Sequence, residues 1–440
     1  MHTALNRRLR NAHRRGVALL LAMGAVVILM VMLTEFQDQT SAELAAAVAN
    51  RDAVQAEYIA KSGLNLSRLL VASEPTVRAA VAPIFMMLGR TAPQLPVWEY
   101  SDRLLGAFNG GDDQESFQST FHVSPEAGKN LGLKDGKFEV TSVDEDAKLN
   151  VNLAAGNDLS HLRFARQVMG LMAPTQFNSL FDTRDELGNT HDRLTICQAF
   201  LDWADQDESA FNCDLSSTAA NGGAEDGYYQ TLPKRYLRKN GAFDSLEEMR
   251  VVRGVGDTFW GTFVDPKPDD PKARVMTVWG QGKVNVNSAN AQTLLALVCG
   301  GAPDAEVCKD PLQTASFLAA VSLARGMSMG APVFGKPRDF IDMLTGKGQM
   351  AAMLTTMGLK PVKFQSEGEF AKTIATESKL FSIYSVGIKK GAKRETRVRV
   401  HAVVDFRPYA PPVSYGAGQG APAQTAAEAA AGNLIFYRVE

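Results

Sequence analysis

An apolar segment near the N-terminus constrains this chain more than any other feature. Residues 17–33 carry no charged side chain, and basic residues crowd the positions before them. These are Arg7, Arg8, Arg10, Arg14 and Arg15. A helix of this length can span a bilayer, and arginines on one flank hold that flank in the cytoplasm. A discarded signal peptide has a shorter apolar region and a small-x-small cleavage site, and the sequence shows neither. We therefore expect a retained anchor with a cytoplasmic N-terminus.

The apolar segment continues into a stretch that favours helix. Residues 34–73 are rich in Ala, Leu, Glu and Gln and contain no proline. This predicts one helix over residues 17–73, about 85 Å long and ended by Pro75. Apolar residues in its second half fall on one stripe, as expected for a helix packed against a globular domain. The stripe consists of Leu44, Val48, Val54, Tyr58, Leu66, Leu69 and Leu70.

Length and charge limit the rest of the chain. With 440 residues, 45% of them hydrophobic, it can bury a substantial core and form more than one structural unit. The net charge is −2, so without the five arginines of residues 1–16 it becomes −7. The part of the chain beyond the membrane is therefore acidic, which does not favour binding to nucleic acid. Beyond the anchor, no second apolar run reaches spanning length.

Four cysteines lie beyond the anchor. They are Cys197, Cys213, Cys299 and Cys308. They allow three pairings, and the orientation of the anchor places them outside the cytoplasm, where disulfides persist. Short loops favour Cys197 with Cys213 and Cys299 with Cys308. A four-cysteine zinc site is the alternative, but the sequence contains no C-x-x-C pair to begin one.

Two short stretches resemble each other: KLNVNLA at residues 148–154 and KVNVNSA at residues 283–289. Each alternates apolar residues with asparagine and then enters a helix-like segment, which predicts a strand-to-helix junction. Residues 137–143 predict a strand before the first junction, and the acidic turn between them predicts a hairpin. Segments with helical character separate the two junctions and follow the second.

The end of the chain also alternates in hydrophobicity. Residues 381–390 and 394–406 are joined at a glycine, which predicts another hairpin. Residues 410–432 are low in complexity and are expected to form a loop, after which LIFYRVE at residues 434–440 could return as a strand. Helices inserted into a frame of strands indicate the α+β class.

Clustered carboxylates mark a candidate site. They are Asp202, Asp205, Asp207, Glu225 and Asp226, and they bracket a loop rich in Gly, Asn and Ser. Such groups repel one another unless water or a hard cation neutralises them, and calcium takes six to eight oxygens from flexible loops. The spacing does not match an EF-hand. From this chemistry alone, a calcium site and a solvated acidic loop both remain open.

Residues 245–256, SLEEMRVVRGVG, have the apolar spacing and Gly-x-Gly turn of a helix-hairpin-helix. Acidic residues outnumber arginines around this segment, which favours a packing role over contacts with nucleic-acid phosphates. The histidines are scattered, and neither G-x-S-x-G nor H-E-x-x-H occurs. We therefore expect neither enzyme activity nor a nucleic-acid partner.

RRGVALLL at residues 14–21 resembles the class III signal of type IV pilins and pseudopilins. The resemblance implies that prepilin peptidase cuts after Gly16 and that the new N-terminal residue, Val17, is methylated. Most pilins carry glutamate five residues after the cut, whereas this chain has Leu21, as in the K-type minor pseudopilins of type II secretion systems. Further blocks resemble that family, in its order. They are RDAVQAEYIAKSGLNLS, DEDAKLNVN, FLDWADQDE, GGAEDGYY, FDSLEEMRVVRGV and GKVNVNSAN.

The resemblance implies a pilin-like fold, in which a long N-terminal helix packs on an antiparallel sheet and a large helical domain is inserted. The expected parts are the leader at 1–16, the helix at 17–73, a pilin-like α/β part at 74–153, the inserted helical domain with the helix-hairpin-helix-like segment at 154–282, the second junction with further helices at 283–375, and the C-terminal hairpin at 376–440. The family binds calcium in its inserted domain, so the resemblance favours calcium and implies Asp205, Asp207, Glu225 and Asp226 as ligands.

The resemblance further implies a function in protein export. A K-type minor pseudopilin would lie at the tip of the pseudopilus, anchored in the inner membrane with its globular part in the periplasm. It would start assembly with other minor pseudopilins and contact the major pseudopilin, with secreted cargo or the outer-membrane secretin as further candidate partners. A type IV pilus minor pilin that acts in adhesion or DNA uptake is the alternative. A membrane-tethered periplasmic enzyme is a third hypothesis.

Overall fold

The N-terminal helix is longer than expected. The computed structural model describes residues 2–87, 91–109, 136–182, 184, 188–214, 227–327, 331–391, 394–407 and 432–440. Helix α1 (His2–Met87) contains Pro75 and Pro83, so the predicted end before Pro75 is wrong. A proline inside a helix costs about 3 kcal/mol. Tertiary contacts of the buried side chains of Val71 and Glu74 offset this cost, and the helix continues.

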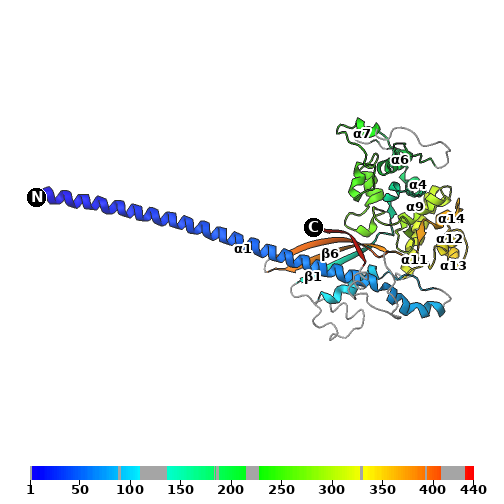
Figure 1. Cartoon of the computed structure of the whole chain (residues 1–440), viewed down its shortest axis with the longest axis horizontal. Coiled ribbons are helices and arrows are strands. Elements are labelled where there is room, and N and C mark those ends of the chain that lie inside the picture. The colour runs from blue at the N-terminus through cyan, green and yellow to red at the C-terminus, as the bar shows by residue number, and fades with distance from the viewer. Residues whose placement is uncertain are drawn as a thin grey trace, which may run out of the picture.

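Helix α1 packs on the sheet with a face of small residues. Ala56, Ala60 and Gly63 are buried, whereas Val54, Tyr58 and Leu69 of the predicted stripe are exposed, so that part of the prediction is wrong. The helix approaches the sheet so closely that a Cβ at Gly387 would lie 1.9 Å from the carbonyl oxygen of Ala56. Close backbone approach therefore selects the buried face, and the larger apolar side chains point outward. Figure 1 shows the N-terminal part of α1 projecting from the head.

The sheet has four antiparallel strands in the order β1-β6-β7-β8. They are β1 (Gly136–Asp144), β6 (Leu380–Lys390), β7 (Glu395–Asp405) and β8 (Asn433–Val439). The predicted hairpin of β6 and β7 and the closing strand are confirmed. The predicted loop at 410–432 lies outside the described residues except for Gly432.

The expected hairpin after β1 is wrong. Strand β1 pairs with β6, far along the chain, while β2 (Leu149–Asn150) pairs in parallel with β3 (Met276–Thr277). The turn between β1 and β2 is tight, because the backbone N–H of Lys148 donates to the carbonyl oxygen of Glu145 at 3.3 Å. It redirects the chain into the inserted domain instead of returning it along β1.

Both predicted strand-to-helix junctions are present, and in each an asparagine side chain bonds to the backbone of the turn. Asn150 accepts a hydrogen bond from the backbone N–H of Asn152 after β2, and Asn285 does the same for Asn287 after β4 (Val284–Asn285). Strand β4 pairs in parallel with β5 (Ile374–Ala375). The helices that follow, α4 (Asp158–Met172) and α9 (Ala291–Gly301), pack directly on each other. Gly170 permits this contact, since a Cβ there would lie 2.1 Å from the carbonyl oxygen of Ala296.

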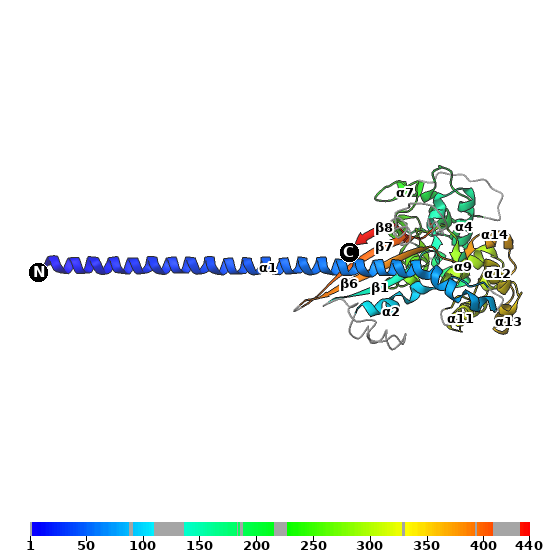
Figure 2. The ribbon, with the colours of Figure 1, turned by 60° about the horizontal axis from the view of Figure 1, so that its bottom comes forward.

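Further helices complete the inserted part between β1 and β6 (Figures 1 and 2). They are α5 (Asn178–Asp182), α6 (Arg193–Ala204), α7 (Gly227–Thr231), α8 (Asp257–Phe259), α10 (Glu306–Lys309), α11 (Pro311–Met327), α12 (Pro337–Leu344), α13 (Gln349–Thr356) and α14 (Glu367–Ala371). A short helix, α2 (Ser101–Leu105), lies beside β1. One hydrophobic core includes residues from Ala147 to Ile374, and a second fills the space between α1 and the sheet. The fold is α+β and pilin-like, with a helical insertion.

The expected cysteine pairs are both disulfides in the structure. Cys197, in α6, bonds to Cys213 and ties the acidic loop to that helix. Cys299, in α9, bonds to Cys308 in α10. All four cysteines are buried in the core of the insertion, so the disulfides reinforce the part of the chain that carries the candidate metal site.

Candidate functional site

The projecting part of α1 is the first candidate site. Within the described residues, α1 is the one helix long and apolar enough to cross a membrane. None of the apolar side chains in this part is buried; Leu21, for example, is 70% exposed. An apolar surface of this length has to be covered by lipid or by other helices. Gly16 and Val17 lie within the continuous helix, and cleavage between them remains a prediction.

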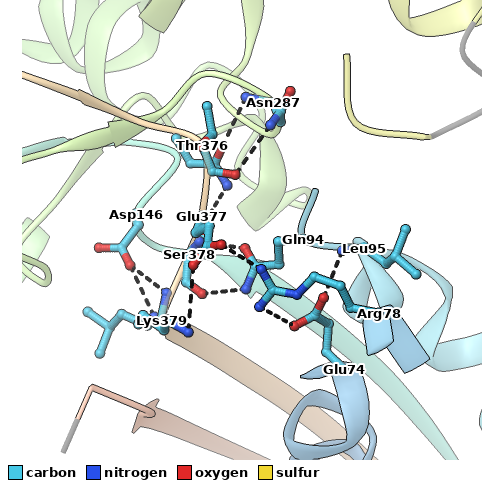
Figure 3. Close-up of polar contacts among 12 residues, drawn as sticks. Glu74, Arg78, Gln94, Leu95, Asp146, Asn287, Thr376, Glu377, Ser378 and Lys379 are labelled. Carbon is cyan, nitrogen blue, oxygen red and sulfur yellow. Dashed lines mark hydrogen bonds and ion pairs between the residues drawn. The ribbon is translucent and has the colours of Figure 1, made fainter. Parts of the chain in front are cut away.

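A polar cluster fixes the distal end of α1 to the sheet (Figure 3). The carboxylate of Glu74 accepts a hydrogen bond from the backbone N–H of Leu95 at 2.9 Å and pairs with Arg78 at 3.2 Å. Arg78 also pairs with Glu377 at 2.5 Å, in the segment just before β6. Burial raises the pKa of Glu74, while the Leu95 N–H and Arg78 oppose that rise. These contacts hold the helix across Pro75.

The same segment before β6 is held from two other sides (Figure 3). The side-chain amide of Gln94 exchanges two hydrogen bonds with the backbone of Ser378, at 2.8 and 2.6 Å. Asp146 accepts hydrogen bonds from the backbone N–H groups of Lys379 and Leu380. Helix, sheet and insertion therefore meet at residues 377–380. The sequence analysis did not predict this junction. The available signal was the four-residue spacing of Glu74 and Arg78, which places an acid and a base side by side on a helix.

The acidic turn after β1 is buried at that junction instead of being exposed. Asp144 accepts hydrogen bonds from the hydroxyls of Ser288 and Ser378, and its other oxygen is buried without a partner among the described residues. Burial raises the pKa of Asp144 to about 7, and the charge of Asp146 adds to the rise. Burial also opposes ionisation of Glu145, but Lys148, at 3.1 Å, and hydroxyl donors hold the pKa of Glu145 below its usual value.

Replacing Asp144 by asparagine should flatten the pH dependence of stability. Because the folded pKa lies above the unfolded value of 3.8, the native state holds an extra proton between the two pKa values, and stability falls as the pH rises from 3.8 to 7. The loss is on the order of 4 kcal/mol. At pH 8 the melting temperature of Asp144→Asn should be higher than that of the native chain, and at pH 4 it should not be.

Glu139→Gln, at an exposed position of β1, is the control. If the melting temperature of Asp144→Asn varied with pH as that of the native chain does, the prediction would be contradicted.

The acidic loop follows α6, where Asp202 and Asp205 are both buried. Asp202 accepts a hydrogen bond from the backbone N–H of Phe211 at 2.8 Å, and Asp207 accepts one from Ser209 at 2.7 Å. Burial raises the pKa of Asp202 to about 6. Burial, with the charges of Asp202 and Asp207, raises the pKa of Asp205 to about 7. Burial thus disfavours the charge of Asp202 and Asp205, and the exposed Asp207 adds to the repulsion at Asp205.

These residues fit a cation in one respect. One carboxylate oxygen of Asp205 is buried and has no hydrogen-bond partner among the described residues, as expected for an oxygen that is available to a metal. The other two expected ligands, Glu225 and Asp226, lie outside the described residues. In the part of the chain that the structure describes, no group of three or more His, Cys, Asp or Glu side chains is placed to hold a metal.

The helix-hairpin-helix-like segment forms a 3₁₀ helix (Leu246–Val251), a turn and the short helix α8. Gly254 has a φ of 84°, and a Cβ there would lie 2.6 Å from Ile196 in α6. Met249, Val252 and Val255 belong to the core of the insertion. The segment therefore packs against α6, which is the role the sequence favoured.

Comparisons with known proteins match the chain to a family model and to solved structures. Residues 147–260 match the family model of type II secretion system protein K. The crystal structure of the GspK-GspI-GspJ complex from the enterotoxigenic Escherichia coli type 2 secretion system contains a similar chain, 15% identical, with 70% of this chain and 81% of that chain covered and a TM-score of 0.38. No curated protein sequence matches the chain. The matched family segment includes Asp205, Asp207 and the packing segment at 245–256.

Proposed function

Because the chain belongs to the protein K family of type II secretion systems and is a minor pseudopilin of that type, we propose that it occupies the tip of a pseudopilus, where it starts assembly and supports export. The position of the insertion carries this proposal. The insertion lies at the end of the molecule remote from the N-terminus of α1 (Figure 1). A subunit stacked on that end would collide with the insertion, so the chain suits a position with partners below and none above.

The stem of α1 supplies the contacts with partners in this proposal. Val17 and the apolar residues after it lie in the inner membrane, with the N-terminus in the cytoplasm and the head in the periplasm. Leu21 offers no carboxylate to a neighbouring N-terminal amine, which separates the chain from major subunits. The stem joins other minor pseudopilins and the major pseudopilin below it. Secreted cargo and the outer-membrane secretin are the candidate partners of the free distal end.

The position at the tip can be tested on purified fibres. Antibody labelling of this chain should mark one end of each fibre, because the insertion prevents another subunit from stacking on it. Cells that lack the chain should form fewer fibres and should retain their exported proteins in the periplasm. Labelling along the whole fibre, in amounts comparable to the major pseudopilin, would contradict the proposal.

We also propose that the acidic loop binds calcium. Asp205 and Asp207 would be ligands, with Glu225 and Asp226, and the ion would neutralise carboxylates that repel one another when ionised. The buried oxygen of Asp205 without a partner supports this. The disulfide between Cys197 and Cys213 encloses Asp205 and Asp207 in a short loop and so restricts it for binding.

Calcium should raise the melting temperature of the full-length chain in detergent. A ligand that binds only the native state stabilises it, by about 2.7 kcal/mol at 100 times Kd. The difference between calcium and chelator should shrink in Asp205→Asn and persist in Asp304→Asn, where an exposed acid is neutralised instead. Equal melting temperatures of the native chain with and without calcium would exclude the site.

A further inference from the structure

The two edges of the four-stranded sheet differ. At the β1 edge, the side-chain amide of Asn109 donates to the carbonyl oxygen of Phe138 at 2.7 Å, and the N–H of Phe138 donates back to it at 2.8 Å. At the β8 edge, no strand of the described chain pairs with the outer side. A side chain of the protein therefore caps the β1 edge at Phe138, whereas no described strand bonds to the outer backbone groups of β8.

The register identifies which backbone groups point outward. Glu440 and Arg399 exchange two hydrogen bonds, at 3.0 and 2.7 Å, so they form a hydrogen-bonded pair. Such pairs alternate along an antiparallel ladder. Arg438 opposite His401 is therefore bonded to β7, whereas Tyr437 and Val439 direct their N–H and C=O groups away from it. The register shift between Val403 and Val404 lies beyond this part of the strand.

The open edge has little protection near the C-terminal end of β8. Native sheets guard exposed edges with charged side chains, above all lysine, with proline and with bulges. The register shift of β8 lies near its start, away from Tyr437 and Val439. Strand β8 contains neither lysine nor proline, and its Arg438 pairs with Glu440 at 3.4 Å. The side chains of Ile435, Tyr437 and Val439 are 40%, 40% and 41% exposed. An unguarded edge with apolar side chains is suited to pairing with another strand.

The edge is continuous with the stem of α1. Tyr437 lies opposite Ala402, which is buried in the core between α1 and the sheet, so it occupies the face that α1 covers. Arg68 of α1 donates to the carbonyl oxygen of Gly432, just before β8, at 3.0 Å. Figure 2 shows β8 beside α1 on the side of the head where the stem leaves it. A subunit bound along the stem would therefore bring its own head next to β8.

We propose that an extended segment of a neighbouring minor pseudopilin adds to the sheet along β8. Its backbone would bond to Tyr437 and Val439, and its alternate apolar side chains would cover the tyrosine and valine side chains. The inference rests on the proposed function, because that function supplies the neighbour. Open backbone groups, exposed apolar side chains and continuity with the stem favour this occupant over a soluble ligand.

Hydrogen exchange of the full-length chain tests the proposal. Two samples in detergent are compared: the isolated chain, and the chain in complex with the co-expressed minor pseudopilins of its own secretion system. In the complex, the amides of Tyr437 and Val439 should exchange at least tenfold more slowly, while those of Phe436 and Arg438, already bonded to β7, should change little. Tyr437→Pro removes the outward N–H without touching the β7 ladder, and Tyr437→Thr removes only the ring. The amount of partner that co-purifies with the proline variant should be at least tenfold lower than with the threonine variant.

The outcomes separate this inference from the proposed function. If no complex forms with the native chain, the proposed function fails. If the complex forms but both amides exchange at their free rate, only the strand addition is wrong. Slow exchange in the isolated monomer would show that the chain covers its own edge, and slow exchange in a homodimer would show a second copy there; either result overturns the proposal. If the proline variant does not fold, exchange in the native complex decides.

Discussion

Replacing Val48 by aspartate should abolish co-purification of the chain with other minor pseudopilins. Val48 belongs to the exposed apolar surface of α1 formed with Leu44, Val54 and Tyr58. Neighbouring stems in a bundle bury such a surface, and an ionised carboxylate in that contact would lose its water without gaining a partner. We expect affinity to fall at least a hundredfold, or about 2.8 kcal/mol.

The matched control is Ala42→Asp, which introduces the same charge at another exposed position of the helix. At about 100° per residue, position 42 lies at least about 120° around the helix from every residue of that apolar surface. It should retain the partners. Both variants should keep both disulfides and the native melting temperature, because position 48 is exposed in the isolated chain. Normal co-purification of Val48→Asp would contradict the assignment of the stem as the partner surface.

Replacing Gly16 by valine should leave the whole chain uncleaved in the inner membrane. If prepilin peptidase recognises the residue before the cut, a valine side chain would fill space that glycine leaves empty and would so block cleavage. Intact-mass measurement should then find the precursor, whereas the native chain should begin at a methylated Val17. Loss of processing should also remove the chain from fibres, because the basic leader would stay attached to the end of the stem.

Gly24→Val provides the control for side-chain bulk within the same helix. A Cβ at Gly24 would meet no atom of this chain within 4 Å, so the substitution should fold and be processed normally. A mature N-terminus at any residue other than Val17 would contradict the predicted site. Blocked processing in Gly24→Val as well would show that Gly16→Val acts through the helix and not through the cut.

Much of the frame could be predicted from local sequence. Hydrophobic alternation predicted the hairpin of β6 and β7, and the repeated asparagine motif predicted the junctions that lead into α4 and α9. Short loop lengths predicted both disulfides. These features depend on residues that are neighbours in the chain, so the period or spacing of the sequence carries the information.

The candidate sites were only partly predictable. The calcium ligands stay a prediction, and local sequence did not show that Asp144 and Glu145 would be buried. An acidic turn normally remains in water. Here it is buried because Ser288 and Ser378 supply hydrogen bonds from other parts of the fold, while Lys148 of the same turn supplies a charge to Glu145. No pattern local to residues 144–148 records the two serines.

The sequence by itself determined that this chain has one apolar anchor, a long helix, a strand frame and two short disulfide loops, because each depends on composition or spacing over a few turns or residues. Tertiary structure alone decided that β1 pairs with β6, that small residues and not the larger apolar stripe face the sheet, and that α1 continues past Pro75. The physical reason is shared. Each of these outcomes is set by how closely two distant backbones can approach and by which buried polar groups find partners there.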